Sequence, residues 1–496
     1  MERLSAADVI RTTLVARHPL IALLSAEEER VERCLRDVSA TTFAQPAPFY
    51  TWALTRGLVG PDGKVVKGTE DPLAALDAIA KVDGAGLFLM RDLHVHLDDP
   101  RLMRRLRDLR TELAPSFRFV FLLATRWRVP PELRRDVALV EFPLPTAEEL
   151  GAQLTSHLEK ADPPLEADDE TQRRFVTALQ GLTENEANHA LNRALFKRQA
   201  LDDQVLGLLY EQKEQLARKE GVLEFVPQRW QVNDIGGLDV LKEWLTKRRK
   251  LFDDTSKEVE ELIPKGLLIM GISGCGKSLS IKAISSLWNL PLFRLDMGQV
   301  FSGVHGTPEE AFDRALKMME AVAPAILWID EIENGISAEN TGADAGTKGR
   351  IFATFLTWMQ EKSGRIFVAA TANRIDLLPA ELLRKGRFDQ VFFIDLPSEA
   401  ERSQIFAVHL YRRGVDPKSV DINVLAKATK NWNGAEIEQC VVSSMVEAYD
   451  KGEPVTDDEL FSQIGKIVPL ATTMAEQIKG IKSWAHDRAI RASEGK

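Results

Sequence analysis

The chain has 496 residues, of which 44% are hydrophobic and 28% charged, and its formal net charge is −10. This length predicts two to four domains, and the composition is typical of a globular protein. The acidic balance argues against a general binder of the nucleic-acid backbone, and no apolar run reaches the ~20 residues that a membrane span requires. Because the start has no apolar signal core and the three cysteines have no metal-site spacing, we expect a cytoplasmic protein.

The first half, residues 1–145, carries short apolar runs that are typical of buried parallel strands, and helical patterns follow at 146–200. In the stretch "GLFLMRDLHVH", the run Leu87–Met90 is followed by Arg91 and Asp92, a base and an acid at a strand end. The pattern predicts an α/β domain followed by a helical segment.

Residues 101–110, "RLMRRLRDLR", form the one strongly basic stretch of the sequence. Leu102, Leu106 and Leu109 would share one side of a helix, so we favour a solvated basic face over buried leucines. A nucleic-acid-binding helix is the alternative. A further polar helix with one apolar stripe is expected within a linker at 201–230.

Residues 231–396 alternate short apolar runs with helical patterns, which predicts a parallel sheet covered by helices. After Pro397 only helical patterns remain, so residues 397–496 are expected to form a helical lid and a C-terminal tail. The five apolar runs lie at 266–271, 290–296, 325–330, 365–373 and 390–396.

The stretch "GISGCGKSLS", residues 271–280, fits the P-loop pattern G-x-x-x-x-G-K-[ST] and lies between an apolar run and a helical pattern. Its glycines allow backbone N–H groups to face a polyphosphate at the start of a helix. Lys277 is expected to reach the β- and γ-phosphates, and the Ser278 hydroxyl is expected to hold Mg²⁺. The nucleotide-binding set of this loop is Gly271, Ser273, Gly274, Cys275, Gly276, Lys277, Ser278 and Leu279.

Two acids follow the apolar run "AILWI". Asp330 is expected to hold Mg²⁺ together with Ser278, and Glu331 to polarise a water molecule for attack on the γ-phosphate. A solvated loop is the alternative for adjacent acids. Asn373 ends the next run, where its amide is expected to orient the attacking water, although a plain turn residue would show the same pattern.

Arg384 and Arg387 lie in "LLRKGRFD", far along the chain from the P-loop. In a ring of subunits they would act as arginine fingers that neutralise charge at a neighbour's nucleotide, an effect worth ~10³–10⁵ in rate. A pair of surface salt bridges, each worth under about 1 kcal/mol, is the alternative.

From "NDIGGLDVLKEWL" (233–245) to about residue 445, the chain resembles an ATPase of the AAA clade. The segments "GISGCGKSLSIKAISSLWNLPLFRLDMG", "LWIDEIE" and "TANRIDLLPAELLRKGRFDQVFFIDLP" resemble the uncharacterised AAA ATPases encoded by plastid and cyanobacterial hypothetical reading frames. That family also has a long N-terminal region without a P-loop. The resemblance implies a P-loop α/β fold with a helical lid, with ATP and Mg²⁺ as ligands.

The resemblance also implies contacts that the P-loop pattern alone does not give. Asp234, Ile235 and Gly236 would line the adenine pocket. Gly434 and Ala435, in "NWNGAEIEQC", would close over the nucleotide from the lid. The lid segment lacks the arginine that other branches of the wider superfamily place on the γ-phosphate, but members of this clade commonly lack it too.

Unfoldase members of the clade grip a polypeptide with an aromatic-hydrophobic-glycine loop in a central pore. The matching stretch here is "FSGVHGTPEE", in which Val304 and His305 precede Gly306. No aromatic residue stands at the gripping position, although Phe301 is nearby. Threading of a polypeptide is therefore left open.

Three segments of the first half resemble second-half segments in the same order, beginning with "GLFLMRD" and "AILWIDE". We interpret this as an ancient duplication, with chance resemblance between α/β strands as the alternative. Arg91 then replaces Asp330 and Asp92 replaces Glu331, and an arginine repels a metal ion. The first half is expected to be a degenerate ATPase-like domain without a nucleotide site, or else an unrelated α/β domain.

The sequence therefore predicts an Mg²⁺-dependent ATPase that assembles into a ring, expected to be a hexamer, and remodels or regulates an unidentified protein client. The first half would supply recognition or regulation. A nucleotide-gated assembly scaffold with slow hydrolysis and no threading is the alternative. A nucleic-acid motor is disfavoured by the acidic composition.

Overall fold

The computed structural model of the chain describes residues 5–126, 129–196, 198, 200–227, 230–253, 259, 262–304, 306–336, 345–362, 365–374, 377–384 and 386–494. The chain divides into two compact units, Met1–Pro164 with Leu182–Arg193, and Leu165–Gly181 with Ala194–Lys496. Among the described helices, none combines the length and the apolar character that crossing a bilayer requires.

The first unit contains a six-stranded sheet with the order β3-β2-β4-β5-β1-β6. Its strands are parallel, apart from β3, which pairs antiparallel with β2. The strands are β1 (Leu20–Leu24), β2 (Phe49–Ala53), β3 (Gly57–Val59), β4 (Gly86–Arg91), β5 (Arg118–Ala124) and β6 (Ala138–Glu141).

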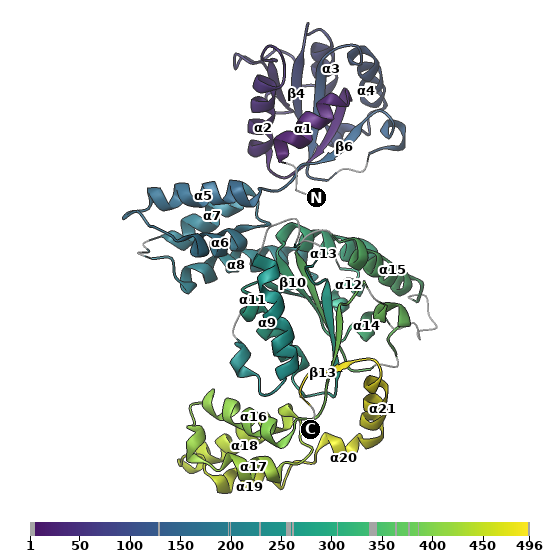
Figure 1. Cartoon of the computed structure of the whole chain (residues 1–496). Helices are drawn as coiled ribbons and strands as arrows, with labels where there is room; N and C mark the ends of the chain where they lie inside the picture. Colours follow the sequence, from purple (N-terminus) through teal and green to yellow (C-terminus); the bar gives the residue numbers. More distant parts are fainter. Residues whose placement is uncertain are drawn as a thin grey trace. The chain divides into compact units, whose positions relative to one another are not determined.

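Helices cover both faces of this sheet (Figure 1). Alternate strand residues point to opposite faces, so Leu87 and Leu123 pack with α1 and α2 while Phe88 and Leu122 pack with α3 and α4. Burial on both faces explains why these strands read as continuous apolar runs. The helices of the unit are α1 (Ala6–Val15), α2 (Glu28–Thr41), α3 (Pro72–Ala80), α4 (Pro100–Leu113), α5 (Ala147–Lys160) and α7 (Glu184–Leu195), whose last two residues count with the second unit.

The second unit contains a seven-stranded sheet with the order β13-β12-β8-β11-β10-β9-β7, in which only β7 runs antiparallel to its neighbour among the described strands. Its strands are β7 (Leu223–Val226), β8 (Gly266–Gly271), β9 (Leu292–Leu295), β10 (Ala325–Ile329), β11 (Ile366–Ala372), β12 (Gln390–Ile394) and β13 (Ile490–Arg491). The parallel sheet covered by helices is confirmed.

Helices α9 and α11 lie on one face of this sheet, and α12 to α15 lie on the other (Figure 1). Trp288 of α11 packs edge-on against Phe367 of β11, with ring centroids 4.6 Å apart, an arrangement that adds to the gain from burial. These helices are α9 (Asp239–Asp253), α11 (Lys277–Trp288), α12 (Met297–Phe301), α13 (Pro308–Val322), α14 (Ile332–Ile336) and α15 (Ala345–Glu361).

After β12 the chain forms a helical bundle with its own core, built around Phe406, Trp432, Cys440 and Leu460. The segment before the sheet is helical as well, and Lys213 of α8 donates to the carbonyl of Thr177 near the end of α6. These helices are α6 (Asp169–Leu179), α8 (Asp203–Glu220), α16 (Glu399–Tyr411), α17 (Ile422–Ala428), α18 (Gly434–Lys451), α19 (Asp457–Ile464), α20 (Leu470–Thr473) and α21 (Ala475–His486).

The two sheets share one connectivity. Along β6-β1-β5-β4-β2 and along β12-β8-β11-β10-β9, the strands occur in the chain order fifth, first, fourth, third, second. The pairs β4 and β10, and β5 and β11, are thus equivalent by position. This agreement supports the interpretation of the first half as a duplicated ATPase-like domain.

Candidate functional site

The P-loop joins β8 to α11 at the carboxyl edge of the second sheet. Gly271, Gly274 and Gly276 have φ values of 152°, 77° and 92°, in the region that favours glycine. A Cβ added at Gly271 would lie 2.2 Å from the carbonyl oxygen of Ile394, so the loop must pass close to β12. The loop therefore adopts the tightly curled course that a polyphosphate cradle requires.

Lys277 begins α11 and is nearly buried. Its Nζ donates to the carbonyl oxygens of Gly271 and Ile272, both at 3.0 Å, so the ammonium lies across the loop. Burial lowers the pKa of Lys277, although the nearby Glu333 and Asp330 oppose this shift. An ammonium held inside the loop fits an anionic ligand there.

Other loop residues have structural contacts. Cys275 and Leu279 pack against the core beneath α11, and burial raises the pKa of the Cys275 thiol to about 12. The carbonyl of Ser273 accepts a hydrogen bond from Nδ2 of Asn433 at 3.3 Å. The lid thus reaches the phosphate loop directly.

Asp330 and Glu331 directly follow β10, as expected from the sequence. Oδ1 of Asp330 accepts hydrogen bonds from Ser278 Oγ at 3.2 Å and from Thr371 Oγ1 at 2.6 Å. The structure thus joins both predicted metal ligands, Ser278 and Asp330. A carboxylate and a hydroxyl are the hard oxygen ligands that Mg²⁺ accepts.

The Glu331 carboxylate is held by two amides. Oε1 accepts from Asn373 Nδ2 at 2.6 Å, and Oε2 accepts from Asn334 Nδ2 at 2.7 Å. Oδ1 of Asn373 is buried and accepts no hydrogen bond from the residues that the structure describes. The structure therefore brings Asn373 to the predicted base, with one amide oxygen left for a further donor.

Glu333 was not predicted from the sequence. Only 2% of it is exposed, and its Oε1 accepts from the backbone N–H groups of Asn373 and Arg374 at 2.8 and 3.0 Å. It therefore fixes the backbone that carries Asn373. The available signal was a third acid two residues after Glu331, but the partners of Glu333 lie 40 and 41 residues further along the chain.

The lid closes on the P-loop through the start of α18. Asn433 caps this helix by accepting from the N–H of Glu436 at 2.8 Å. The N–H of Ala435 donates to the carbonyl of Gly274 at 3.0 Å, and Gly434 lies so close that an added Cβ would be 3.2 Å from the same oxygen. The residues assigned by resemblance to the lid thus contact the loop, and Asn433 was missed.

Residues 234–237 lie against α16 of the lid. The N–H of Gly237 donates to Gln404 Oε1 at 2.7 Å, and the carbonyl of Ile235 accepts from Lys242 at 2.6 Å. A Cβ added at Gly236 would lie 2.8 Å from Ile405. Oδ2 of Asp234 lies 3.8 Å from Nη1 of Arg412, and the guanidinium of Arg412 stacks over the Trp230 ring.

Arg384 and Arg387 differ in their environments. The side chain of Arg384 is exposed. Arg387 is half-buried and donates through Nη1 to the carbonyl of Glu381, so it does have a partner within the chain. The arginine-finger assignment thus stays a prediction for both residues, and Arg387 has in addition a backbone partner within its own chain.

The stretch from Phe301 to Glu310 connects α12 to α13. Val304 is 77% exposed, and the ammonium of Lys348 lies 5.6 Å from the centre of the Phe301 ring. His305 lies outside the described residues. Phe301 is therefore engaged within the chain, and the exposed apolar group of this loop is Val304.

In the first unit, the position equivalent to the P-loop edge is filled by ion pairs. Arg91 ends β4, and its guanidinium pairs with Glu28 at 3.1 Å and with Glu32, both on α2. Where Asp330 accepts a hydrogen bond from Ser278 of α11, the equivalent position of the first unit thus carries an arginine that pairs with two acids of α2. Asp92 and Glu331 share a left-handed backbone, with φ values of 54° and 47°, which agrees with their predicted equivalence.

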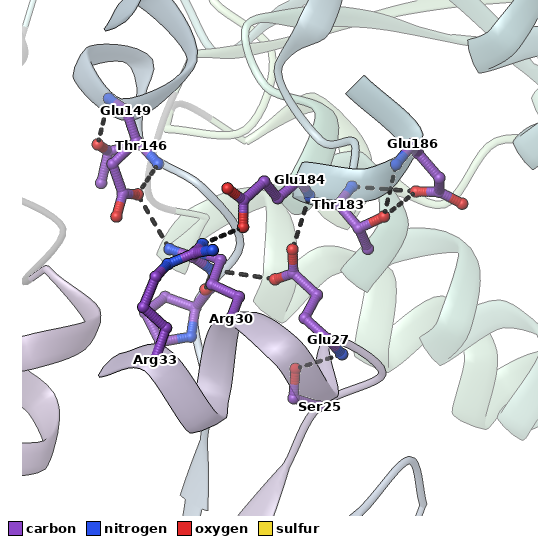
Figure 2. Close-up of polar contacts among 10 residues, drawn as sticks. Ser25, Glu27, Arg30, Arg33, Thr146, Glu149, Thr183, Glu184 and Glu186 are labelled. Carbon is purple, nitrogen blue, oxygen red and sulfur yellow. Dashed lines mark hydrogen bonds and ion pairs between the residues drawn. The ribbon is translucent and has the colours of Figure 1, made fainter. Parts of the chain in front are cut away.

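A second, buried ion pair lies at the start of α2 (Figure 2). Arg30 donates to Glu27 and to Glu149 of α5, both at 2.9 Å. Glu27 also accepts from the backbone N–H of Glu184, the first residue of α7, at 2.7 Å. We call Glu27 and Arg30 the latch pair, because they tie the start of α2 to α5 and α7. Burial raises the pKa of Glu27 despite these donors.

The basic stretch at 101–110 forms α4, with Leu102, Leu106 and Leu109 buried as predicted. Its arginines have acidic partners. The pairs are Arg101 with Asp99, Arg104 with Asp108, Arg105 with Asp77 and Glu112, and Arg107 and Arg110 with Asp136. This pairing favours the solvated basic face over a nucleic-acid interface.

Comparisons with known proteins agree with this architecture. The ATPase family associated with various cellular activities (AAA) matches residues 267–396. The N-terminal domain and the second domain of the SpoVK-like AAA ATPases match residues 6–142 and 148–220. Together with the P-loop and the acids after β10, these matches define the chain as an AAA ATPase family protein.

Full-length relatives narrow this class. The uncharacterized AAA domain-containing protein ycf46 of Pyropia yezoensis is 36% identical over 490 residues, which cover 98% of each chain. That of Guillardia theta is 36% identical over 483 residues, covering 96% of this chain and 94% of the relative. The chain belongs to this ycf46 family. The proteasome-activating nucleotidase of Thermococcus onnurineus is 30% identical over 259 residues, or 50% of this chain and 63% of the relative.

Proposed function

We propose that the second unit binds ATP with Mg²⁺ and hydrolyses it. The observation that carries this proposal is a pair of hydrogen bonds, Ser278 with Asp330 and Asn373 with Glu331, which Thr371 joins into one network beside a curled P-loop. Ser278 and Asp330 would hold Mg²⁺, and the metal would stabilise the negative charge that develops on the phosphates.

The residues around this set have separable roles. Lys277 would leave the carbonyls of Gly271 and Ile272 to bind phosphate oxygens. The Glu331 carboxylate would accept a proton from water, and Asn373 and Asn334 would keep it in position, each through one of its oxygens. The adenine would lie beside Asp234 to Gly236, which pack against the lid.

The test is Glu331→Gln, with Asp92→Asn in the first unit as the matched control, because Asp92 has the same backbone conformation at the equivalent strand end. We expect the Glu331 variant to bind Mg-ATP with wild-type affinity but to lose turnover by at least 100-fold, as for a general base. The control should hydrolyse ATP normally. Wild-type turnover in Glu331→Gln would refute the assignment.

We further propose a homo-oligomeric ring, a hexamer, in which Arg384 and Arg387 act on a neighbour's nucleotide. Support comes from the exposure of Arg384, since an arginine directed at another subunit must be free of its own core. Arg384→Ala should reduce hydrolysis ~10³-fold or more with nucleotide binding unchanged. Full activity in a sample held monomeric by dilution, verified by mass photometry, would contradict the shared site.

The ring is proposed to act in the cytoplasm on a protein client, with the first unit supplying recognition. Its second candidate role is a nucleotide-gated scaffold, which the exposed Val304 in place of an aromatic residue favours. Steady-state ATPase rates with and without unfolded protein substrates distinguish the two. Stimulation by a substrate supports remodelling, and an unchanged slow rate supports the scaffold.

A further inference from the structure

The hydroxyl of Thr371 lies between the two acids of the site. Thr371 follows Ala370 on β11, is 1% exposed, and donates from Oγ1 to Asp330 Oδ1 at 2.6 Å. The same oxygen accepts the backbone N–H of Glu331 at 2.9 Å. A hydroxyl has one proton to donate, so this pair of bonds fixes its orientation.

The left-handed backbone of Glu331 directs its N–H toward β11, with φ at 47°. In the structure this N–H is paired with the hydroxyl of Thr371, whose side chain is buried. Two explanations of Thr371 are therefore possible. Its hydroxyl is there either to satisfy the turn or to hold Asp330.

The first unit separates these explanations. Met90 of β4 pairs with Leu122 and Arg91 with Leu123, just as Ile329 of β10 pairs with Ala370, the residue before Thr371. Leu123 thus takes the position of Thr371.

The turn in the first unit is equally left-handed at Asp92, yet the Asp92 N–H donates to the backbone carbonyl of Leu123 at 3.0 Å. The same turn forms without a hydroxyl. In that unit the position of Asp330 is held by Arg91, which pairs with acids of α2 instead. The threonine is therefore found where the strand end carries Asp330, the predicted metal ligand, and the left-handed turn alone does not require it.

We propose that Thr371 is a positioning residue. Its hydroxyl fixes the Asp330 carboxylate for Mg²⁺ and, by accepting the backbone N–H of Glu331, also holds Glu331 for water activation. The inference rests on the proposed ATPase function. Partners that orient a metal ligand in this way typically contribute 10–100-fold to metal affinity or activity.

The test compares Thr371→Val, which keeps the shape and removes the hydroxyl, with Thr371→Ser, which keeps the hydroxyl. Thr429→Val is the matched control, because Thr429 is fully buried in the lid bundle and its hydroxyl donates to the Leu425 carbonyl at 2.8 Å. Two quantities are measured: the Mg²⁺ concentration that half-saturates binding of a fluorescent ATP analogue, and kcat with KM at saturating Mg²⁺.

In Thr371→Val we expect the half-saturating Mg²⁺ concentration to rise about 10-fold and kcat to fall about 10–100-fold, with KM at saturating Mg²⁺ nearly unchanged. Thr371→Ser and Thr429→Val should stay within about 3-fold of wild type. An unchanged Mg²⁺ dependence in Thr371→Val, or equal losses in the Val and Ser variants, would overturn the inference. A wild-type protein that does not hydrolyse ATP would instead refute the proposed function.

Discussion

The latch pair of the first unit makes a quantitative prediction for Arg30→Met. The side chains of Arg30 and Glu27 are 7% and 5% exposed, so removal of the arginine leaves a buried carboxylate whose remaining donor is the Glu184 N–H. Breaking a buried ion pair on one side costs about 3–5 kcal/mol. Because ~1.4 kcal/mol is a factor of ten, local opening of α5 and α7 should become roughly 10²–10⁴ times more frequent.

Hydrogen–deuterium exchange of the full chain measures this opening in peptides that cover α5 and α7. The loss of protection against exchange in Arg30→Met should be smaller at pH 5 than at pH 8. Burial raises the pKa of Glu27 in the folded protein, so stability is retained below the unfolded-state pKa and is lost as pH rises through the folded-state pKa. Replacing both partners, with Glu27→Leu and Arg30→Met, should restore most of the protection. Unchanged exchange in Arg30→Met at pH 8 would refute the latch.

Two further predictions concern the second unit. Gly274→Ala should weaken ATP binding at least 10-fold in a titration, because φ is 77° and the new Cβ would lie 2.8 Å from the Asn433 side chain. The control is Gly68→Ala, which has a similar φ but open space around the new Cβ and should bind ATP normally. Equal ATP affinities of Gly274→Ala and wild type would contradict the contact between the lid and the P-loop. Lys213 is fully buried, and burial lowers its pKa to about 7, so wild-type stability should rise between pH 7 and 10 as the unfolded chain alone binds the proton. The rise should be measured as an increase in melting temperature, and Lys213→Met should not show it. The same dependence of melting temperature on pH in Lys213→Met and wild type would contradict the prediction.

Local patterns were sufficient for the elements that carry the nucleotide site. The glycine spacing of the P-loop requires positive φ values, and the structure has them at Gly274 and Gly276. The apolar run "AILWI" forms a strand buried on both faces, so the acids after it had to reach the carboxyl edge of the sheet. Such features depend on residues close in sequence, and the sequence therefore predicted them.

The contacts that organise the site depend on distant residues and were not predicted. Thr371 reads as one more small residue of a strand, and its role follows only from the register between β11 and β10. Arg91 pairs with acids of α2, and one of them, Glu32, lies 59 residues away in the sequence. Asn433 reads as a helix cap, and its second contact crosses from the lid to Ser273.

The partners of the charged side chains could not be predicted from the sequence either. The basic stretch gave no sign of its acidic partners on other elements, such as Asp77 and Asp136. Arg387 resembles Arg384 in the sequence, but the fold directs it to the carbonyl of Glu381. Charge pairing across elements is a property of the tertiary structure, so composition alone could not assign either group.

We propose that the second unit binds a nucleotide, whereas in the first unit ion pairs occupy the equivalent edge of the sheet. Isothermal titration calorimetry of the Glu331→Gln protein with Mg-ATP, repeated with the double variant Glu331→Gln and Lys277→Ala, measures the number of nucleotide sites per chain. We expect saturable Mg-ATP binding in the Glu331→Gln protein, at no more than one site per chain, and no saturable binding in the double variant. Two sites per chain, or binding that survives the loss of Lys277, would contradict it.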